Sequence, residues 1–269
     1  MIISRTPLRM SFVGGGSDLP VFYRKFGGAV VSTAINQFIY ITLNKKFDQK
    51  IRVSYSKTEE ARTVDRIKHP LVREAMKLLG TGGGVEITSI ADIPGKGSGL
   101  GSSSSFTVGL LHALHAYAGR YVSAEQLARE ACEIEIDRCA EPIGRQDQYA
   151  AAFGGLNFIQ FRPDDSVSVE PILCKKETLR QMQEHTLVFY TGITRSASAI
   201  LQHQQSAVAT EKKKQKVMRR MVELARDLKR ELESNRVAGF GEIIHEGWTL
   251  KKSLTGGIRS EERRVGKEC

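Results

Sequence analysis

The first third of the chain places apolar and polar residues alternately in short runs bounded by glycine, a pattern typical of half-buried strands. β-branched residues are frequent in these runs, which cover residues 8–13, 29–35, 39–43, 51–55 and 85–90. Residues 69–79 instead repeat apolar positions every three or four residues and end at Gly80, as a helix does. We therefore predict several strands and one intervening helix in this region.

The middle of the chain changes to a helical period. Residues 106–117 are almost wholly apolar, which predicts a buried helix, and Ser123 opens a capping box for a helix that reaches about residue 139. A shorter helix at 145–153 is followed by two glycines. Further strands are predicted at 156–161, 167–172 and 185–190. Since nearly everything after Thr194 has a helical pattern, we predict an α+β fold whose second part is rich in helices.

Composition limits the class of protein. With 269 residues, 41% of them hydrophobic, the chain can bury one large core or two small ones. No run of about eighteen apolar residues occurs, and the first residues lack the layout of a signal peptide, so no membrane span or export is predicted. The four cysteines show no CxxC spacing, which indicates free thiols in a reducing cytoplasm.

The formal net charge of +10 indicates either a small anionic substrate or a polyanionic partner. Residues 211–236 hold ten basic and five acidic residues, and their apolar positions recur every three or four residues. These apolar positions are Val217, Met221, Leu224, Leu228 and Leu232. We predict a helix with a solvated basic face. Because nucleic-acid binders usually carry interleaved aromatic residues or a known module, no nucleic-acid partner is predicted.

Residues 94–105 have the sequence PGKGSGLGSSSS, between a predicted strand and a predicted helix. Glycine lets a backbone approach a ligand closely, and a helix beginning at Ser102 or Ser103 adds the positive end of its dipole. Such a cradle suits a phosphate, with Lys96 as a point charge and a serine hydroxyl as a ligand for Mg²⁺. The spacing matches neither GxGxxG nor GxxxxGK[ST]. A flexible linker is the alternative, but linkers lie between domains rather than between a strand and a buried helix.

These residues resemble the nucleotide-binding loop of the GHMP kinases, whose pattern P-x-x-x-G-L-G-S-S-[AS] is long and specific. The resemblance implies an ATP- and Mg²⁺-dependent kinase with an N-terminal domain like domain 2 of ribosomal protein S5 and a ferredoxin-like C-terminal domain. It assigns ATP binding to Pro94, Gly95, Lys96, Gly97, Ser98, Gly99, Leu100, Gly101, Ser102, Ser103 and Ser104.

Phosphoryl transfer also needs a group that orients the attacking hydroxyl or accepts its proton. The residues alone do not single out Glu135 among its acidic neighbours, whereas Asp147, which an apolar run follows, is harder to explain as a surface residue. The segment GRQDQ resembles the glycine-x-x-Asp-Gln segment of the family, which implies that Asp147 is the catalytic base. The same resemblance makes Glu135, twelve residues earlier, a ligand of Mg²⁺ together with Ser103. Whether Asp147 takes the proton or only orients the hydroxyl stays open.

The segment RTPLRMSFVGGGSDLP, at residues 5–20, has the pattern of a strand that runs into a glycine turn, where Asp18 can also be an ordinary turn residue. It resembles the sugar-binding loop of galactokinases, in which an arginine precedes the aspartate by nine residues. The resemblance implies that Asp18, with Ser17 and Gly16, binds sugar hydroxyls and that Arg9 lies near Asp147. Galactose is not the expected sugar, because Gly-Gly-Ser stands here in place of the Glu-His-Thr of that enzyme.

Three longer segments, GGGSDLPVFY, EPIGRQDQYAAAFGGLN and LVFYTGITRSASAIL, resemble the D-glycero-D-manno-heptose 7-phosphate kinases within the same family. This resemblance implies phosphorylation of the anomeric C1 hydroxyl on the way to GDP-heptose, with Thr191 and Arg195 at the sugar-phosphate site. Arg195 is equally plausible as a surface residue at a helix start. The alternatives are another sugar 1-kinase, such as one for fucose, or a non-catalytic protein that binds nucleotide and sugar phosphate on this fold.

The resemblance covers residues 2 to about 257. It predicts a nucleotide- and sugar-binding domain at 1–184 and an incomplete second domain at 185–257. Residues 258–269 stand where the family has a third glycine-rich motif, and we expect them to be a non-native tail. The expected partners are ATP and a sugar phosphate, without nucleic acid or membrane, in the cytoplasm, and a homodimer is left open.

Overall fold

The computed structural model describes residues 1–93, 98–189 and 197–254 of the chain. The described chain forms two compact units, with residues 1–10 and 33–156 in unit 1 and residues 11–32, 157–189 and 197–254 in unit 2. Strands β1 (Ile2–Val13) and β2 (Gly28–Lys45) contribute to both units. Strands and helices occur together in each unit, which confirms the predicted α+β class. The domain boundary at 184/185 stays a prediction.

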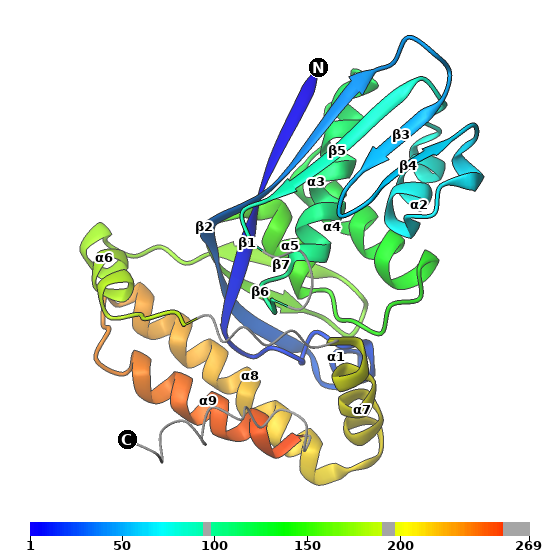
Figure 1. Cartoon of the computed structure of the whole chain (residues 1–269). Coiled ribbons are helices and arrows are strands. Elements are labelled where there is room, and N and C mark those ends of the chain that lie inside the picture. Colours follow the sequence, from blue (N-terminus) through cyan, green and yellow to red (C-terminus); the bar gives the residue numbers. More distant parts are fainter. Residues whose placement is uncertain (94–97, 190–196, 255–269) are drawn as a thin grey trace, which may run out of the picture. The chain divides into compact units, whose positions relative to one another are not determined.

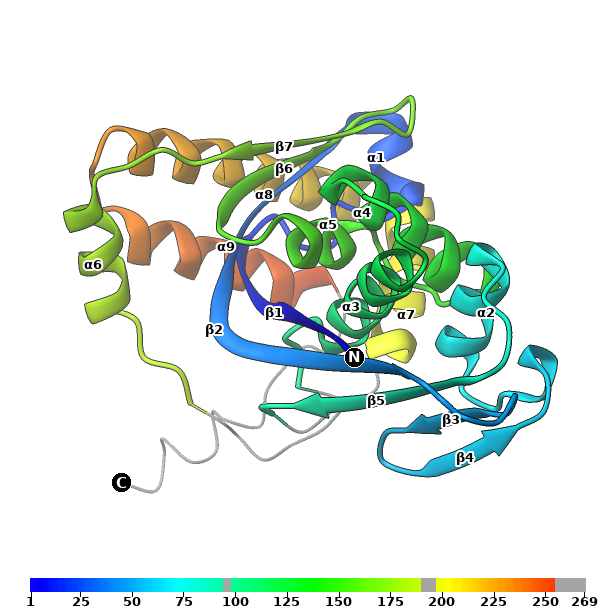
Figure 2. The same ribbon diagram turned by 90° about the horizontal axis from the view of Figure 1, so that it is seen from above.

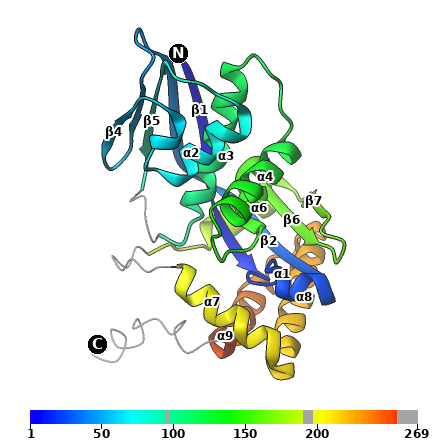
Figure 3. The ribbon, with the colours of Figure 1, turned by 90° about the vertical axis from the view of Figure 1, so that its right-hand side faces the viewer.

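Unit 1 is a sheet with helices on one of its faces (Figures 1 and 3). Besides the shared strands it contains β3 (Ile51–Ser54), β4 (Thr58–Ala61), η1 (Val64–Arg66), α2 (Pro70–Leu79), β5 (Val85–Ala91), α3 (Ser102–Tyr117), α4 (Ala124–Cys132), η2 (Glu133–Arg138) and α5 (Gln146–Phe153). The strand order is β4-β3-β5-β2, and β1 also pairs with β2. Strand β5 is antiparallel to β2 and parallel to β3, so that Leu43 and Val53 both lie opposite Ile87.

The alternation in the sequence sets which face of this sheet is buried. Ile39, Ile41 and Leu43 of β2 are buried, while the intervening Tyr40 and Thr42 are partly exposed. The buried side chains join those of β3, β5, α2 and α3 in one hydrophobic core. Period-two patterning therefore places the apolar face of the sheet against the helices.

The predicted helix ends in unit 1 are confirmed. Gly80 follows α2 with φ of 65°, a left-handed conformation that glycine adopts without strain. The Ser123 side chain accepts a hydrogen bond from the Gln126 N–H at 3.2 Å and caps α4. Helix α3 begins directly after the glycine loop at Ser102, which is one of the two predicted starts, Ser102 and Ser103.

Unit 2 combines a small part of the sheet with several helices. It contains α1 (Pro20–Phe26), β6 (Leu156–Phe161), β7 (Val167–Pro171), α6 (Lys176–Glu184), α7 (Ala197–Thr210), α8 (Lys212–Glu233) and α9 (Phe240–Leu254). Strands β6 and β7 are antiparallel neighbours, with β2 on the other side of β6 (Figure 2). Helices α8 and α9 lie side by side (Figures 1 and 2). A Cβ on Gly247 of α9 would lie 3.1 Å from a methyl group of Val13, so glycine permits close packing there.

The basic amphipathic helix is confirmed as α8. Of its predicted apolar positions, Met221, Leu224, Leu228 and Leu232 are buried and Val217 is partly exposed. Its lysines at the N-terminal end, including Lys212, Lys213 and Lys216, are exposed. No helix among the described residues is both long and apolar enough to cross a membrane.

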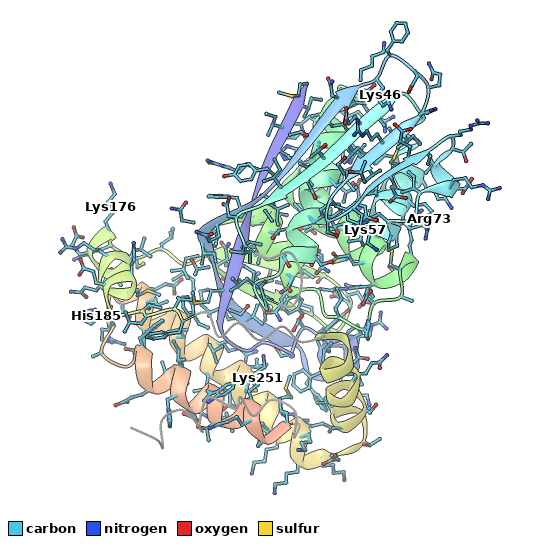
Figure 4. The ribbon with its side chains drawn as sticks, in the orientation of Figure 1. Lys46, Lys57, Arg73, Lys176, His185 and Lys251 are labelled. Carbon is cyan, nitrogen blue, oxygen red and sulfur yellow. The ribbon has the colours of Figure 1, made fainter. Side chains whose placement is uncertain are left out.

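The strand predicted at 185–190 is wrong over the described residues 185–189. The chain forms helix α6 just before it, whose two ends are marked by Lys176 and His185 in Figure 4. Residues 186–189 then have no regular structure, and Leu187, Val188 and Phe189 are largely exposed. An apolar run becomes a strand only with a partner to hydrogen-bond, and none of the described strands pairs with this segment. The tail predicted at 258–269 lies outside the described residues.

Several short elements, among them α1 and β4, were not predicted. Helix α1 follows the glycine turn and begins at Pro20, a residue suited to the first helical position. Strand β4 pairs with β3 across a tight connection. Among the described residues, Cys132, Cys139 and Cys174 form no disulfide bond.

Candidate active site

The site in unit 1 begins at the junction of the glycine loop and α3. Of the loop residues predicted to bind ATP, Pro94, Gly95, Lys96 and Gly97 lie outside the described residues, and Ser98 to Ser104 lie within them. Gly99 and Gly101 have positive φ angles of 71° and 76°, and Gly101 is the N-cap residue of α3. The backbone therefore turns sharply into a helix of 16 residues whose positive dipole end faces this turn.

Arg9 of β1 and Asp147 of α5 form a bidentate ion pair beside this turn. Arg9 Nε donates to Asp147 Oδ1 at 2.8 Å, and Arg9 Nη2 donates to Oδ2 at 2.7 Å. The side chains of Arg9 and Asp147 are only 12% and 25% exposed, so the pair is largely shielded from solvent. Paired, coplanar donors of this kind hold a carboxylate in one orientation. The predicted proximity of Arg9 and Asp147 is thus confirmed in the geometry of unit 1.

Arg9 also holds the end of the glycine loop. Its Nη1 donates to the carbonyl of Gly99 at 2.6 Å, and its backbone N–H donates to the carbonyl of Leu100 at 3.1 Å. A Cβ on Gly101 would lie 3.2 Å from Arg9 Cγ and 3.5 Å from Asp147 Oδ2. The loop thus packs directly on the ion pair, and a Cβ at position 101 would require Arg9 to move by a few tenths of an ångström.

Glu135, in the same unit, is completely buried. It is part of η2, a π-helical continuation of α4, and such turns are rare and often occur at functional sites. Its Oε1 accepts hydrogen bonds from Ser103 Oγ at 3.0 Å and Thr107 Oγ1 at 2.8 Å. Its Oε2 accepts from Ser104 Oγ at 2.7 Å and Gln148 Nε2 at 2.5 Å. Four neutral donors therefore surround one carboxylate.

Burial raises the pKa of Glu135 above its ordinary value, and the hydrogen bonds from Ser104, Thr107, Gln148 and Ser103 oppose that rise. A buried carboxylate with no cation bound is costly, and a bound cation would offset that cost. The described residues contain no group of three or more His, Cys, Asp or Glu side chains arranged for a metal. One carboxylate and one hydroxyl nevertheless suit Mg²⁺, which binds few protein oxygens and takes the rest of its ligands from phosphate and water. Glu135 and Ser103 fit this requirement once the Ser103 hydroxyl turns away from Glu135 Oε1, because that movement frees one lone pair on the carboxylate and one on the hydroxyl for the cation.

The predicted sugar-binding residues lie in unit 2, in the turn between β1 and α1. Asp18 is 2% exposed, and its Oδ1 accepts the Gly16 N–H at 2.8 Å. Ser17 Oγ donates to the carbonyl of Ala29 and accepts the N–H of the same residue. Asp18 is thus a turn-stabilising residue in this structure, and its contact with sugar hydroxyls stays a prediction. Thr191 and Arg195 lie outside the described residues.

Two residues of the Glu135 cluster were missed by sequence reasoning, namely Thr107 and Gln148. Each is a polar residue within a buried stretch of helix, at 0% exposure. A polar side chain inside an apolar helical run is the signal that points to such residues, because a buried polar group needs a partner.

Comparison with known proteins agrees with these features. Residues 67–155 match the family model of the GHMP kinases N terminal domain. The D-glycero-alpha-D-manno-heptose 7-phosphate kinase of Campylobacter jejuni is 29% identical over 276 aligned residues, which cover 97% of this chain and 80% of that protein.

Solved structures share the fold. The crystal structure of a D-glycero-D-manno-heptose 1-phosphate kinase from Bacteroides thetaiotaomicron has a TM-score of 0.79 at 26% identity and covers 94% of this chain and 79% of that one. Phosphomevalonate kinase of Streptococcus pneumoniae, solved with phosphomevalonate and AMPPNP, has a TM-score of 0.75 at 16% identity, covering 95% and 81% of the two chains. Residues 67–155 thus correspond to a GHMP kinases N terminal domain, and the chain as a whole is similar to heptose phosphate kinases in sequence and fold.

Proposed function

We propose that this GHMP-type sugar kinase transfers the γ-phosphoryl group of ATP to the anomeric C1 hydroxyl of D-glycero-D-manno-heptose 7-phosphate. The product would be the 1,7-bisphosphate, a precursor for GDP-heptose. The name of the Campylobacter relative supports this sugar and the position of its existing phosphate. The Bacteroides relative is instead called a heptose 1-phosphate kinase, so the position of transfer is a point for experiment.

The observation that carries the proposal is the Arg9–Asp147 pair packed against the glycine cap of α3. The transition state of phosphoryl transfer is loose, so catalysis depends more on orientation and charge neutralisation than on a strong base. Both oxygens of Asp147 accept bonds from Arg9, and each keeps a second lone pair. We infer that a free lone pair accepts the hydrogen of the sugar hydroxyl and receives its proton as the new O–P bond forms.

The start of α3 supplies the phosphate side of the reaction. The backbone amides of residues 98–104 and the helix dipole favour an anion at this position. When bound, Mg²⁺ would neutralise phosphate charge, held by Ser103 and Glu135. Arg9 fixes the position of the glycine loop relative to Asp147, because its side chain donates hydrogen bonds to both the Gly99 carbonyl and the Asp147 carboxylate.

For the sugar, we propose that Gly16, Ser17 and Asp18 contact its hydroxyl groups, and that Thr191 and Arg195 contact its distal phosphate. A buried aspartate is suited to sugar hydroxyls, because its carboxylate accepts several hydrogen bonds in a fixed geometry. In an Asp18→Ala variant we expect a higher KM for the sugar or a lower kcat, with the KM for ATP unchanged. Unchanged sugar kinetics would remove Asp18 from the sugar site.

The function is tested with purified protein, Mg²⁺ and ATP against a panel of sugars. The panel contains heptose 7-phosphate, heptose 1-phosphate, unphosphorylated heptose, L-fucose and D-galactose, with ADP release as the rate and ³¹P NMR as the assignment of the new phosphate. We expect turnover with heptose 7-phosphate to exceed that with every other sugar and the new phosphate to appear on C1.

The panel also separates the competing functions. Preference for L-fucose would indicate a fucose-type 1-kinase, and phosphate added to C7 of heptose 1-phosphate would overturn the proposed position. ATP binding without turnover on any sugar would favour the non-catalytic alternative. Failure to bind magnesium nucleotide would contradict the phosphate site itself.

A further inference from the structure

The side chain of Gln148 is fully buried, but only one end of its amide is paired. Its Nε2 donates to Glu135 Oε2 at 2.5 Å. Its Oε1 has no hydrogen-bond partner within the part of the chain that the structure describes. The amide cannot be reversed, because that would place its oxygen against the carboxylate oxygen of Glu135. The amide that donates to Glu135 therefore carries a buried acceptor, Gln148 Oε1, that no described residue satisfies.

The position of Gln148 in the chain connects two parts of the site. Ser103, Ser104 and Thr107, which also donate to Glu135, all belong to α3, whereas Gln148 belongs to α5. Gln148 directly follows Asp147, so the first turn of α5 presents one residue to Arg9 and the next to Glu135. A displacement of this turn would therefore move the base and the carboxylate of the cation site together.

An unpaired buried amide oxygen is unfavourable unless a ligand or water satisfies it. Mg²⁺ gives up its water shell reluctantly, so it keeps several waters when it binds to a protein. A water bound to a cation is polarised and is a strong hydrogen-bond donor. Residues that hydrogen-bond to a metal ligand commonly fix the orientation of that ligand.

We propose that Gln148 is a positioning residue of the cation site: its Nε2 fixes the Glu135 carboxylate, and its Oε1 accepts a hydrogen bond from a water of the bound cation. The proposal rests on the proposed kinase function, because it requires that Glu135 binds the cation of a magnesium nucleotide. It assigns to Gln148 two roles at once, which Thr107 does not share. Thr107 donates a hydrogen bond to Glu135, and the proposal gives it no acceptor role.

This difference supplies a matched pair of variants. Gln148→Met keeps a side chain of similar length and removes both the donor and the acceptor. Thr107→Val keeps the shape and removes one donor to Glu135. Neither change replaces a residue of the Arg9–Asp147 pair. The excess effect of Gln148→Met over Thr107→Val then measures what the amide adds beyond a single hydrogen bond to the carboxylate.

The measurement is Mn²⁺ binding followed by electron paramagnetic resonance, with a non-hydrolysable ATP analogue and no sugar. Substitution of a residue that hydrogen-bonds to a metal ligand typically lowers metal affinity by about 10–100-fold. We expect the Mn²⁺ affinity of Gln148→Met to fall by about that factor, and that of Thr107→Val to fall by about threefold or less. Affinity for the analogue without metal should be the same in all three proteins.

Each outcome decides the proposal. Equal Mn²⁺ affinities in Gln148→Met and wild type would overturn it, and equal losses in both variants would overturn the acceptor role, because the amide would then act only as a donor. Lack of Mn²⁺-nucleotide binding by the wild type would instead overturn the proposed function.

Thermal unfolding checks that each variant is folded. If Gln148→Met does not fold, Gln148→Asn, which retracts the amide by one methylene, must show the same loss of affinity.

Discussion

The contact between the glycine loop and the ion pair can be tested with a single methyl group. Gly101 has φ of 76°, and a Cβ there would lie 3.2 Å from Arg9 Cγ, 3.4 Å from Arg9 Nε and 3.5 Å from Asp147 Oδ2. In the Gly101→Ala variant, the arginine must therefore move by a few tenths of an ångström. Because Arg9 orients Asp147 through two hydrogen bonds, that movement also shifts Asp147, the proposed base.

The Gly101→Ala change is expected to affect both the folding free energy, through the backbone, and the rate of phosphoryl transfer, through Arg9 and Asp147. An alanine in the left-handed region costs about 1–2 kcal/mol of folding free energy. A misplacement of about 1 Å at reacting groups can cost about 100-fold in rate, so a shift of a few tenths is expected to cost about tenfold, or about 1.4 kcal/mol. Gly101→Ala should thus lower both stability and kcat.

Gly80→Ala is the matched control, because Gly80, at the end of α2, has φ of 65° and a Cβ added to it would meet nothing within 4 Å. Both variants carry a similar backbone cost, but only one meets Arg9. Denaturant unfolding measures stability, and coupled ADP release at saturating ATP and sugar measures kcat. We expect similar losses of stability and a loss of kcat only in Gly101→Ala. Equal kcat in the two variants would refute the link between this glycine and the base.

Three further predictions concern stability and reactivity. Ser123→Ala removes the cap of α4 and should cost about 1 kcal/mol, or about 2–4 °C in Tm, with kcat unchanged; an unchanged Tm would contradict the capping role. Gly109→Ala places a Cβ 2.7 Å from the Thr6 hydroxyl and should cost about 1–3 kcal/mol, whereas Gly82→Ala, which meets no atom within 4 Å, should cost much less. Burial raises the pKa of the Cys139 thiol, with Glu74 adding to the rise, so less thiolate is present at pH 8; iodoacetamide should label it more slowly than glutathione, and faster labelling would contradict this.

Local sequence signals predicted the elements that depend on neighbours along the chain. Strand β6 has the predicted bounds, and the ends of α2 and α4 follow from Gly80 and Ser123. Helix α3 begins at Ser102, one of the two starts, Ser102 and Ser103, that the sequence left open at the end of the glycine-rich stretch. These features are set by backbone preference and capping, which a short window of sequence contains.

Features that depend on distant partners were not predictable in the same way. The strand expected at 185–190 failed because its apolar pattern has no strand to pair with among the described residues. The π-helical turn around Glu135 has no residue type that marks it in the sequence. Gln148 and Glu135 meet across 13 residues, and Thr107 and Glu135 across 28. The resemblance to a family identified Asp147 and Glu135, while the structure added the residues that hold them.

The central claim is that Asp147 orients the sugar hydroxyl and receives its proton while the loop before α3 binds the nucleotide. The most direct measurement compares wild type and Asp147→Asn for nucleotide affinity and for single-turnover phosphoryl transfer to heptose 7-phosphate. We predict nucleotide affinity within about threefold of the wild type and transfer slowed by about 10³-fold, within the usual range for removing an acid–base group. Transfer by Asp147→Asn at the wild-type rate would contradict the account.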